Sequence, residues 1–338
     1  MKALVTGGTG FLGSHLCRRL VAEGWDVAVL CRASSNAEPL KNLPVTKIVG
    51  DLTVPDDTDK AVKGRDAVFH AAAHLSYWGK QKEIQQAINV AGTRNVAEAC
   101  LRRGVGRLVH VSSVAAVGIP GYGESPANED FCFNLADLPL NYHNSKKQAE
   151  DVVLNAVGRG LNAVIANPAS IWGPHGHGYR GSEIVRKVRQ SRYVPYFTGG
   201  ICVVHVDDVV DGLVRAFTRG KTGERYILGS ENARLKEIAR RAAEKQGMNV
   251  RLIPVPSLIT FASALTFEAL ALFTKSKPRV TFTTHRCAGR LHFYDSGKSR
   301  QELGYSPRGL DQILDECIAF TEKHSNLIPT RKVAAGEA

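Results

Sequence analysis

A tyrosine and a lysine four residues apart could carry out acid–base chemistry in this chain. Tyr142 and Lys146 lie in a stretch predicted to be helical, and their spacing places both side chains on one helix face. A free phenol has a pKa of about 10, and a neighbouring ammonium group favours its phenolate form. Tyr142 is therefore a candidate general acid or base.

The same spacing recurs at Tyr294 and Lys298, so position in the chain has to separate the two pairs. Tyr142 follows a predicted strand that ends at Ser112 and Ser113, whereas Tyr294 lies near the C-terminus at the predicted end of a strand. A serine hydroxyl in that place could hydrogen-bond and orient a reacting oxygen. We predict that the first pair acts with Ser113, or with its neighbour Ser112, and that Tyr294 is structural. The alternative is a surface pair without chemistry.

A glycine-rich run, VTGGTGFLG at residues 5–13, joins an apolar strand to an amphipathic helix. Gly7, Gly10 and Gly13 fit G-x-x-G-x-x-G, and starting from Gly8 the run also fits G-x-G-x-x-G. Such glycines let backbone N–H groups approach a pyrophosphate at a helix N-terminus. The context predicts a dinucleotide site, with a glycine turn that binds no ligand as the alternative. The predicted cofactor contacts here are Gly7, Gly10, Phe11, Leu12 and Gly13.

The end of the second predicted strand favours NADP(H). No acidic residue stands there to hold a ribose 2′-hydroxyl; Arg32 takes that place, with a hydroxyl at Ser35. A guanidinium pairs well with a 2′-phosphate. NAD(H) is the alternative if Arg32 only stacks on the adenine. Asp51 could accept a bond from the adenine amine or could be a turn residue. Further predicted cofactor contacts are Asp51, Leu52, Ala71, Ala72 and Ala73.

The elements that position these residues alternate along the first half of the chain. The predicted strands are 3–6, 27–31, 47–49, 67–70, 108–112 and 163–167, and the predicted helices are 11–23, 84–103 and about 140–157. Strands alternating with helices predict a Rossmann-type α/β fold with a doubly wound parallel sheet. We expect an NAD(P)-binding domain over 1–168, to which later strands return. A smaller substrate-binding domain follows over 169–330, and 331–338 form a tail.

In order along the chain, these motifs resemble the extended short-chain dehydrogenases/reductases, the NAD-dependent epimerase/dehydratase family. Further matching runs are GDL at 50–52, HAAA at 70–73, NVAGTRNV at 89–96, VSSVAAVG at 111–118, YHNSK at 142–146, NPASIWGP at 167–174 and VHVDDV at 204–209. The sequence is most similar to the dihydroflavonol-reductase-like group, which includes 3β-hydroxysteroid dehydrogenases and the hopanoid-associated sugar epimerase type. GERYILGS at 223–230 and LGYSPR at 303–308 also resemble that group.

The resemblance implies further site residues. Asn89 would act in a proton relay beside Lys146, and Pro168 to Ser170 would line the nicotinamide. Nucleotide-sugar epimerases of this family tend to carry a tyrosine and an arginine where this chain has Val117 and Asn167. That departure disfavours an epimerase role.

The charge distribution and the spacing of cysteine and histidine residues limit which partners and metal sites the chain could have. The formal charge is +12, but Lys and Arg are spread along the chain, which argues against a nucleic-acid protein. Seven cysteines without a C-x-x-C pair indicate reduced thiols and a cytoplasmic location. His175 and His177 lack further ligands at suitable spacing, so we predict no metal site. Trp78 and His175 are candidate substrate contacts, together with Ser113 and Tyr142.

The stretch Leu258–Phe273 bears on the substrate. It is apolar on more than one helix face, and it is shorter than the ~20 apolar residues that a bilayer span needs. It could be a buried core helix, line a pocket, or contact a membrane through the cations at 275, 277 and 279.

We expect an apolar ketone or secondary alcohol as substrate. The alternatives are a nucleotide-sugar epimerase or dehydratase and a non-catalytic NADP-binding sensor. A homodimer is expected only by analogy.

Overall fold

The computed structural model describes residues 1–175, 178–274, 278 and 280–324. The chain forms two compact units, each built from three segments. Unit 1 comprises Met1–Ala169, Val206–Gly229 and Tyr294–Pro307; unit 2 comprises Ser170–His205, Ser230–Phe293 and Arg308–Ala338. The predicted tail at 331–338 lies outside the described residues.

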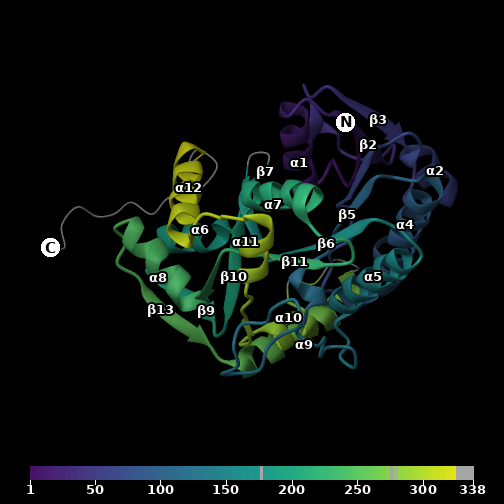
Figure 1. The fold of residues 1–338 in the computed structure, drawn as a ribbon. Helices are drawn as coiled ribbons and strands as arrows, with labels where there is room; N and C mark the ends of the chain where they lie inside the picture. The colour runs from purple at the N-terminus through teal and green to yellow at the C-terminus, as the bar shows by residue number, and fades with distance from the viewer. Residues whose placement is uncertain (176–177, 275–277, 279, 325–338) are drawn as a thin grey trace. The chain divides into compact units, whose positions relative to one another are not determined.

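Unit 1 is built on a seven-stranded parallel sheet (Figure 1). Its order is β11-β6-β5-β4-β1-β2-β3, so the strand order reverses between β1 and β4, which confirms the predicted doubly wound fold. The strands are β1 Lys2–Thr6, β2 Asp26–Cys31, β3 Val45–Val49, β4 Ala67–His70, β5 Arg107–Val111, β6 Ala163–Pro168 and β11 Arg225–Leu228. The central strands are mostly apolar and buried because helices cover both faces, although Thr6, His70 and His110 are buried polar residues in them.

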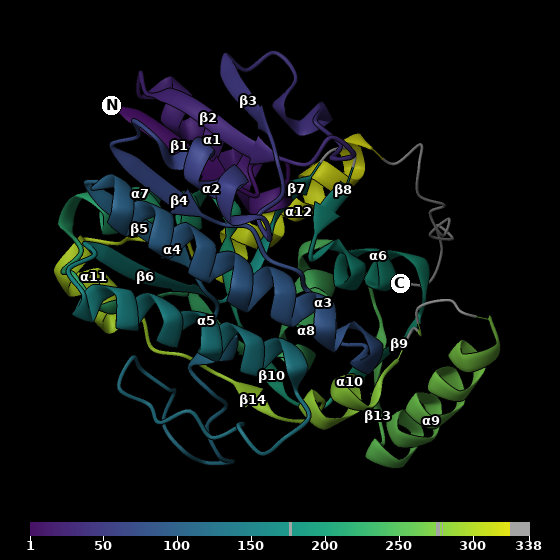
Figure 2. The same ribbon diagram turned by 90° about the vertical axis from the view of Figure 1, so that its right-hand side faces the viewer.

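Helices pack on this sheet in two groups. On one face α2, α4 and α5 pack side by side (Figure 2), and Val62, Val96 and Val153 from them join the core with Leu108 of β5. In the second group α7 packs against α1 and α11. The bounds are α1 Phe11–Ala22, α2 Pro55–Val62, α3 Lys82–Gln85, α4 Gly92–Arg103, α5 Asn141–Gly158, α7 Val206–Arg219 and α11 Gly297–Leu303. Short 3₁₀ turns lie at Glu38–Leu40, Gly79–Gln81 and Val114–Ala116.

The prediction of a single α-helix over 84–103 needs correction. The structure has α3, then a π-helical turn at Gln86–Ala91, then α4, with no break in helical backbone. A π turn inserts an extra residue into the i→i+4 pattern, and such turns are frequent at functional sites. Asn89 lies inside this turn.

Unit 2 holds two small sheets, each packed by helices. One has the order β12-β10-β7-β8 with β14 paired to β10, and the other pairs β13 with β9. The strands are β7 Ser170–His175, β8 Gly178–Arg180, β9 Tyr193–Phe197, β10 Gly200–His205, β12 Glu231–Arg234, β13 Arg251–Val255 and β14 Leu291–His292. The helices are α6 Ser182–Gln190, α8 Leu235–Lys245, α9 Ser257–Thr274, α10 Phe282–Cys287 and α12 Leu310–Lys323. Trp172, Val185, Ile238 and Leu314 lie in its core.

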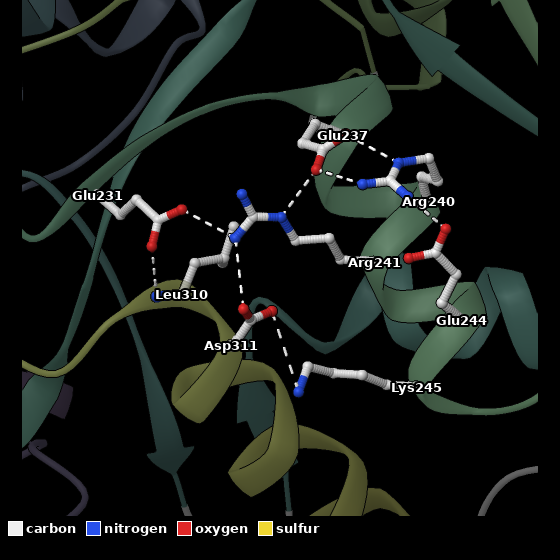
Figure 3. A network of polar contacts seen from close by, with 8 residues as sticks. All are labelled: Glu231, Glu237, Arg240, Arg241, Glu244, Lys245, Leu310 and Asp311. Atoms are coloured by element: carbon white, nitrogen blue, oxygen red, sulfur yellow. Dashed lines mark hydrogen bonds and ion pairs between the residues drawn. The ribbon is translucent and has the colours of Figure 1, made fainter.

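Charged side chains join α8 to the start of α12 within unit 2 (Figure 3). Arg241 lies 2.9 Å from Glu231 and 2.8 Å from Glu237, and a Glu231 oxygen accepts from the backbone N–H of Leu310 at 2.9 Å. Hydrogen bonds from Arg240 and Arg241 lower the pKa of the Glu237 carboxyl to about 2. Such half-exposed pairs contribute little to stability one by one, but the network fixes where α12 begins.

The apolar stretch at 258–273 forms most of α9, and the core-helix interpretation of it is wrong. Several of its large apolar side chains are exposed; those of Leu258 and Phe273 are 75% and 85% exposed. Among the described residues, no helix combines the length and apolarity that crossing a membrane requires.

Candidate active site

The turn between β1 and α1 forms a cradle that only glycine fits. Gly7 has φ +73°, and a Cβ on it would lie 2.7 Å from the backbone N of Ala72. A Cβ on Gly13 would lie 2.1 Å from the carbonyl oxygen of Gly7. Gly10 precedes α1, so no side chain caps the helix, and its first turn contains no acidic residue. The residues present therefore fit a pyrophosphate, which would meet bare backbone and the positive helix end.

Other predicted contacts surround this cradle. Phe11 and Leu12 are the first residues of α1, and Ala71 to Ala73 follow β4 directly. The N–H groups of Ala71 and Ala72 donate to the Thr6 carbonyl at 3.1 Å and to the Thr6 hydroxyl at 3.3 Å. These bonds hold the segment after β4 against the end of β1.

Arg32 and Asp51 lie close together beyond the ends of β2 and β3. The Arg32 side chain is exposed, and the Ser35 N–H closes a turn onto the Arg32 carbonyl at 2.9 Å. Asp51 accepts two bonds from Thr53 through one carboxylate oxygen, at 2.8 and 2.7 Å. These bonds, with a smaller effect of Arg32, hold the pKa of Asp51 below its usual range. Asp51 thus forms a turn; its contact to adenine stays a prediction.

Leu52 packs against the start of α4. A Cβ on Gly92 would lie 2.7 Å from a Leu52 methyl carbon, so a glycine is needed for the helix to approach this closely. Asn95 donates to the Leu52 carbonyl at 3.0 Å.

The three predicted catalytic side chains converge beyond the carboxyl end of β5. Ser113 begins the turn at 114–116, and its hydroxyl accepts from the Ala115 N–H at 3.1 Å. The same hydroxyl is hydrogen-bonded to the phenol of Tyr142, the second residue of α5. Lys146 is one turn further on, where its ammonium group donates to the Val111 carbonyl at 2.9 Å.

Burial sets the proton affinities here. It raises the pKa of Tyr142, and the bond from Ser113 opposes that rise. Lys146 is 2% exposed, and loss of solvent lowers its pKa to about 8, against the opposing attraction of Glu150. His70 and His110, with ring centroids 5.3 Å apart, are both fully buried. Their pKa values fall, that of His70 to about 3, by desolvation first and Lys146 second. Both imidazoles are therefore neutral.

A buried polar network behind the site was not predicted. The amide of Asn167 donates to the Ser113 carbonyl at 2.9 Å and to Glu150 at 2.5 Å. Arg225 of β11 donates to the other Glu150 oxygen at 3.4 Å. Glu150 lies four residues after Lys146, so the same helix-face spacing that paired Tyr142 with Lys146 could have identified it.

Asn89 joins the segment after β4 to α5. Its amide group accepts from the His74 N–H at 2.7 Å and donates to the His74 carbonyl at 3.2 Å. It also donates at 2.9 Å to the hydroxyl of Ser145, which donates to the Tyr142 carbonyl. These bonds position the first turn of α5. The proton-relay role implied by the resemblance stays a prediction.

Two aromatic residues follow β4. The ring of Tyr77 meets that of Tyr142 edge to face at 6.1 Å. Trp78 is half-buried, with the ammonium group of Lys80 5.8 Å from its ring centroid. The sequence singled out Trp78, but Tyr77 is the one in contact with Tyr142. Tyr294 is buried elsewhere in unit 1 and donates to the Gly118 carbonyl at 2.8 Å.

Unit 2 contains a cavity of about 610 Å³. Most of its wall is apolar or aromatic, and three charged residues also line it. The lining includes Trp172, Ile184, Tyr196, Phe197, Leu235, Val255 and Ile259, with Arg180, Glu183 and Lys187. Ser170, at the start of β7, lines it as well and accepts from the Trp172 indole at 3.3 Å.

Pro168 and His175, two further predicted site residues, lie at the ends of strands. Pro168 ends β6 in unit 1. His175 ends β7, but its side chain is outside the described part of the chain, as is His177. Within the described residues no group of histidine, cysteine, aspartate or glutamate could hold a metal ion.

Comparison with known proteins identifies the family. A family model, the NAD dependent epimerase/dehydratase family, matches residues 3–229. The chain belongs to this family. Sterol demethylase protein B of Methylococcus capsulatus is 32% identical over 329 residues, which cover 95% of this chain and 98% of that protein. The 4-hydroxy-2-methyl-3-oxo-4-farnesyl-3,4-dihydroquinoline-1-oxide ketoreductase of Stigmatella aurantiaca is 31% identical over 325 residues, 93% of this chain and 96% of that protein.

A solved structure shares the fold of this chain. The crystal structure of gox2253 superposes with a TM-score of 0.81 at 34% identity, covering 95% of this chain and 98% of that one. The family model and the named relatives confirm the family prediction, and the chain is an oxidoreductase of the extended short-chain dehydrogenase/reductase type.

Proposed function

We propose that this oxidoreductase interconverts a ketone and a secondary alcohol on a largely apolar substrate, with NADP(H) as its preferred cofactor. The observation that carries the proposal is the Ser113–Tyr142 hydrogen bond with the buried Lys146 one helix turn away. This arrangement holds a proton donor, an orienting hydroxyl and a positive charge together. A sensor that only bound the cofactor would not need all three.

The three side chains have different tasks. Ser113 orients the reacting oxygen, and Tyr142 gives it a proton in reduction or takes one in oxidation. Lys146 carries a positive charge at neutral pH because its pKa is about 8, and this charge favours the phenolate when Tyr142 has given up its proton. Lys146 would also hold the nicotinamide ribose, and Pro168 and Ser170 would line the nicotinamide, which supplies or accepts the hydride.

The preference for NADP(H) rests on Arg32. The guanidinium is exposed just beyond β2 and therefore available to a 2′-phosphate. No acidic residue directly follows β2 to hold a ribose 2′-hydroxyl, since Arg32 stands in that place. The cradle at Gly7 and Gly13 fits either cofactor.

The apolar substrate is supported by the cavity in unit 2. Aromatic and aliphatic side chains make most of its wall, and such a wall suits a hydrocarbon skeleton better than a diphosphate. Val117 and Asn167 replace the tyrosine and arginine expected of nucleotide-sugar epimerases. The names of the two relatives, a sterol demethylase protein and a ketoreductase of a farnesylated quinoline, also point to apolar compounds.

A turnover panel tests the proposal. The purified chain is supplied with NADPH or NADH and with steroid ketones, flavonoid ketones, long-chain 3-oxo compounds or uridine-diphosphate sugars. We expect oxidation of NADPH with at least one apolar ketone. Ile184→Asn, in the cavity wall, should raise KM for that ketone, whereas Val49→Asn, at an exposed position of β3, should not. Conversion of nucleotide sugars alone would contradict the proposal.

A further inference from the structure

Helix α9 presents a continuous apolar surface on one side. Leu258, Leu265 and Phe273 are 75%, 54% and 85% exposed, and Ile259, Phe261 and Leu270 are exposed as well. At ~100° per residue these six side chains span about half of the helix circumference. Where the structure describes the side chains of α9, the other exposed positions on that side are Ala262, Thr266 and Ala269, none of them charged. Figure 2 shows α9 at the edge of unit 2, beside α10 and β13.

The opposite side of α9 is firmly anchored. Ala264 and Ala271 are buried on that side. At the boundary between the two sides, the ring of Phe282 on α10 packs against Phe261 with centroids 5.8 Å apart. Glu268, the only charged residue of α9, accepts from the Phe282 N–H at 2.9 Å. The apolar side is thus held outward by packing, and a soluble monomer rarely leaves a patch of this kind uncovered.

Most of the net positive charge of the chain lies in unit 2, the unit that contains α9. Unit 2 contains 20 of the 44 Lys and Arg residues but only 10 of the 32 Asp and Glu residues, so it carries +10 of the net +12. Arg286 on α10 and Arg290 just beyond it are exposed, and three more cations follow α9 in the sequence at 275, 277 and 279. A second copy of this unit would bring like charges together. An anionic surface would be attracted.

We propose that the exposed side of α9 binds an anionic lipid bilayer, with the helix lying in the plane of the interface. An apolar helix face inserts among the acyl chains, and basic residues near the surface each add about 1 kcal/mol of attraction to anionic lipid. The 18 residues of α9 would lie along the surface rather than cross it. Helix α9 belongs to unit 2, whereas the predicted catalytic residues Tyr142 and Lys146 belong to unit 1.

The placement of α9 also suggests a route for substrate, a step that rests on the proposed function. Ile259, Thr260 and Ser263 of α9 line the cavity of unit 2. The helix that touches the bilayer would therefore also be a wall of the cavity that takes an apolar ketone. A ketone dissolved in the bilayer would enter without passing through water.

Vesicle sedimentation of the full chain tests the bilayer proposal without measuring activity. The vesicles are phosphatidylcholine alone, or phosphatidylcholine and phosphatidylglycerol in equal parts, at low and high ionic strength. We expect binding to the anionic vesicles that weakens with salt, and weaker binding to the neutral ones. The triple variant Leu258→Ser, Leu265→Ser, Phe273→Ser should bind at least tenfold more weakly. The matched control is Val49→Ser with Tyr122→Ser, two residues of unit 1 that are 68% and 79% exposed.

Each contrary outcome is decisive. The proposal fails if the wild type does not bind anionic vesicles or if the triple variant binds like the wild type. It also fails if light scattering finds a dimer that the triple variant dissociates, because the face would then join two copies. Phe273→Ser alone, the most exposed of the three, replaces the triple variant if thermal unfolding shows that the latter is not folded. Because binding is measured directly, loss of the proposed reductase activity would not affect this test.

Discussion

Gly7→Ala and Gly24→Ala form a matched pair that tests the cofactor cradle. Both glycines have left-handed backbone, with φ +73° and +77°. A Cβ on Gly24 would meet nothing within 4 Å, whereas a Cβ on Gly7 would lie 2.7 Å from the backbone N of Ala72. The two substitutions therefore share one conformational cost and differ in the clash.

The shared cost is about 1–2 kcal/mol, the penalty for a non-glycine residue in left-handed backbone. Gly24→Ala should lower the free energy of unfolding by roughly that amount and leave the NADPH dissociation constant unchanged. In Gly7→Ala the clashing atoms are backbone, which no rotamer change can move, so the β1–α1 turn has to shift. We expect its dissociation constant to rise by at least about tenfold, or 1.4 kcal/mol of binding free energy.

Urea unfolding gives the stability of each variant, and NADPH fluorescence titration gives its affinity. The reasoning is refuted if folded Gly7→Ala binds NADPH like the wild type. It is also refuted if Gly24→Ala loses as much affinity as Gly7→Ala, because the effect would then come from destabilisation and not from the cradle.

Two further predictions concern charge. The buried ammonium of Lys146 is present below its pKa of about 8 and lost above it, so kcat for ketone reduction should fall as the pH rises through that value. Glu150→Gln removes the carboxylate that raises this pKa and should shift the falling limb to lower pH; a limb that does not move contradicts the assignment. Arg32→Asp should weaken NADPH binding and improve NADH binding relative to the wild type in parallel titrations. If the wild type binds both cofactors equally, Arg32 does not select a 2′-phosphate.

Local patterns predicted the framework of unit 1. Alternating strands and helices, with a glycine turn after the first strand, are enough to indicate a doubly wound sheet. The choice of Tyr142 over Tyr294 needed only the order of elements, since the carboxyl ends of parallel strands gather at one edge. The structure brings Tyr142, Ser113 and Lys146 together there.

What the sequence could not reveal depends on contacts between distant segments. The π turn around Asn89 has the same apolar periodicity as an ordinary helix, so no pattern distinguishes it. The bonds from Asn167 and Arg225 to Glu150 join three separate elements. The apolar composition of α9 is equally compatible with burial and with exposure, and only packing decides between them.

The central claim is that Tyr142 transfers a proton to and from the substrate oxygen. Turnover of an accepted ketone by Tyr142→Phe tests it most directly, with Tyr294→Phe as the control, since both substitutions remove only a phenol oxygen. We predict that Tyr142→Phe lowers kcat by about 10²–10⁴-fold, the rate enhancement that general acid–base catalysis usually gives. NADPH should still bind to this variant. Tyr294→Phe should lose about 1 kcal/mol of stability, from its bond to Gly118, and little turnover. A Tyr142→Phe enzyme as active as the wild type would contradict the account.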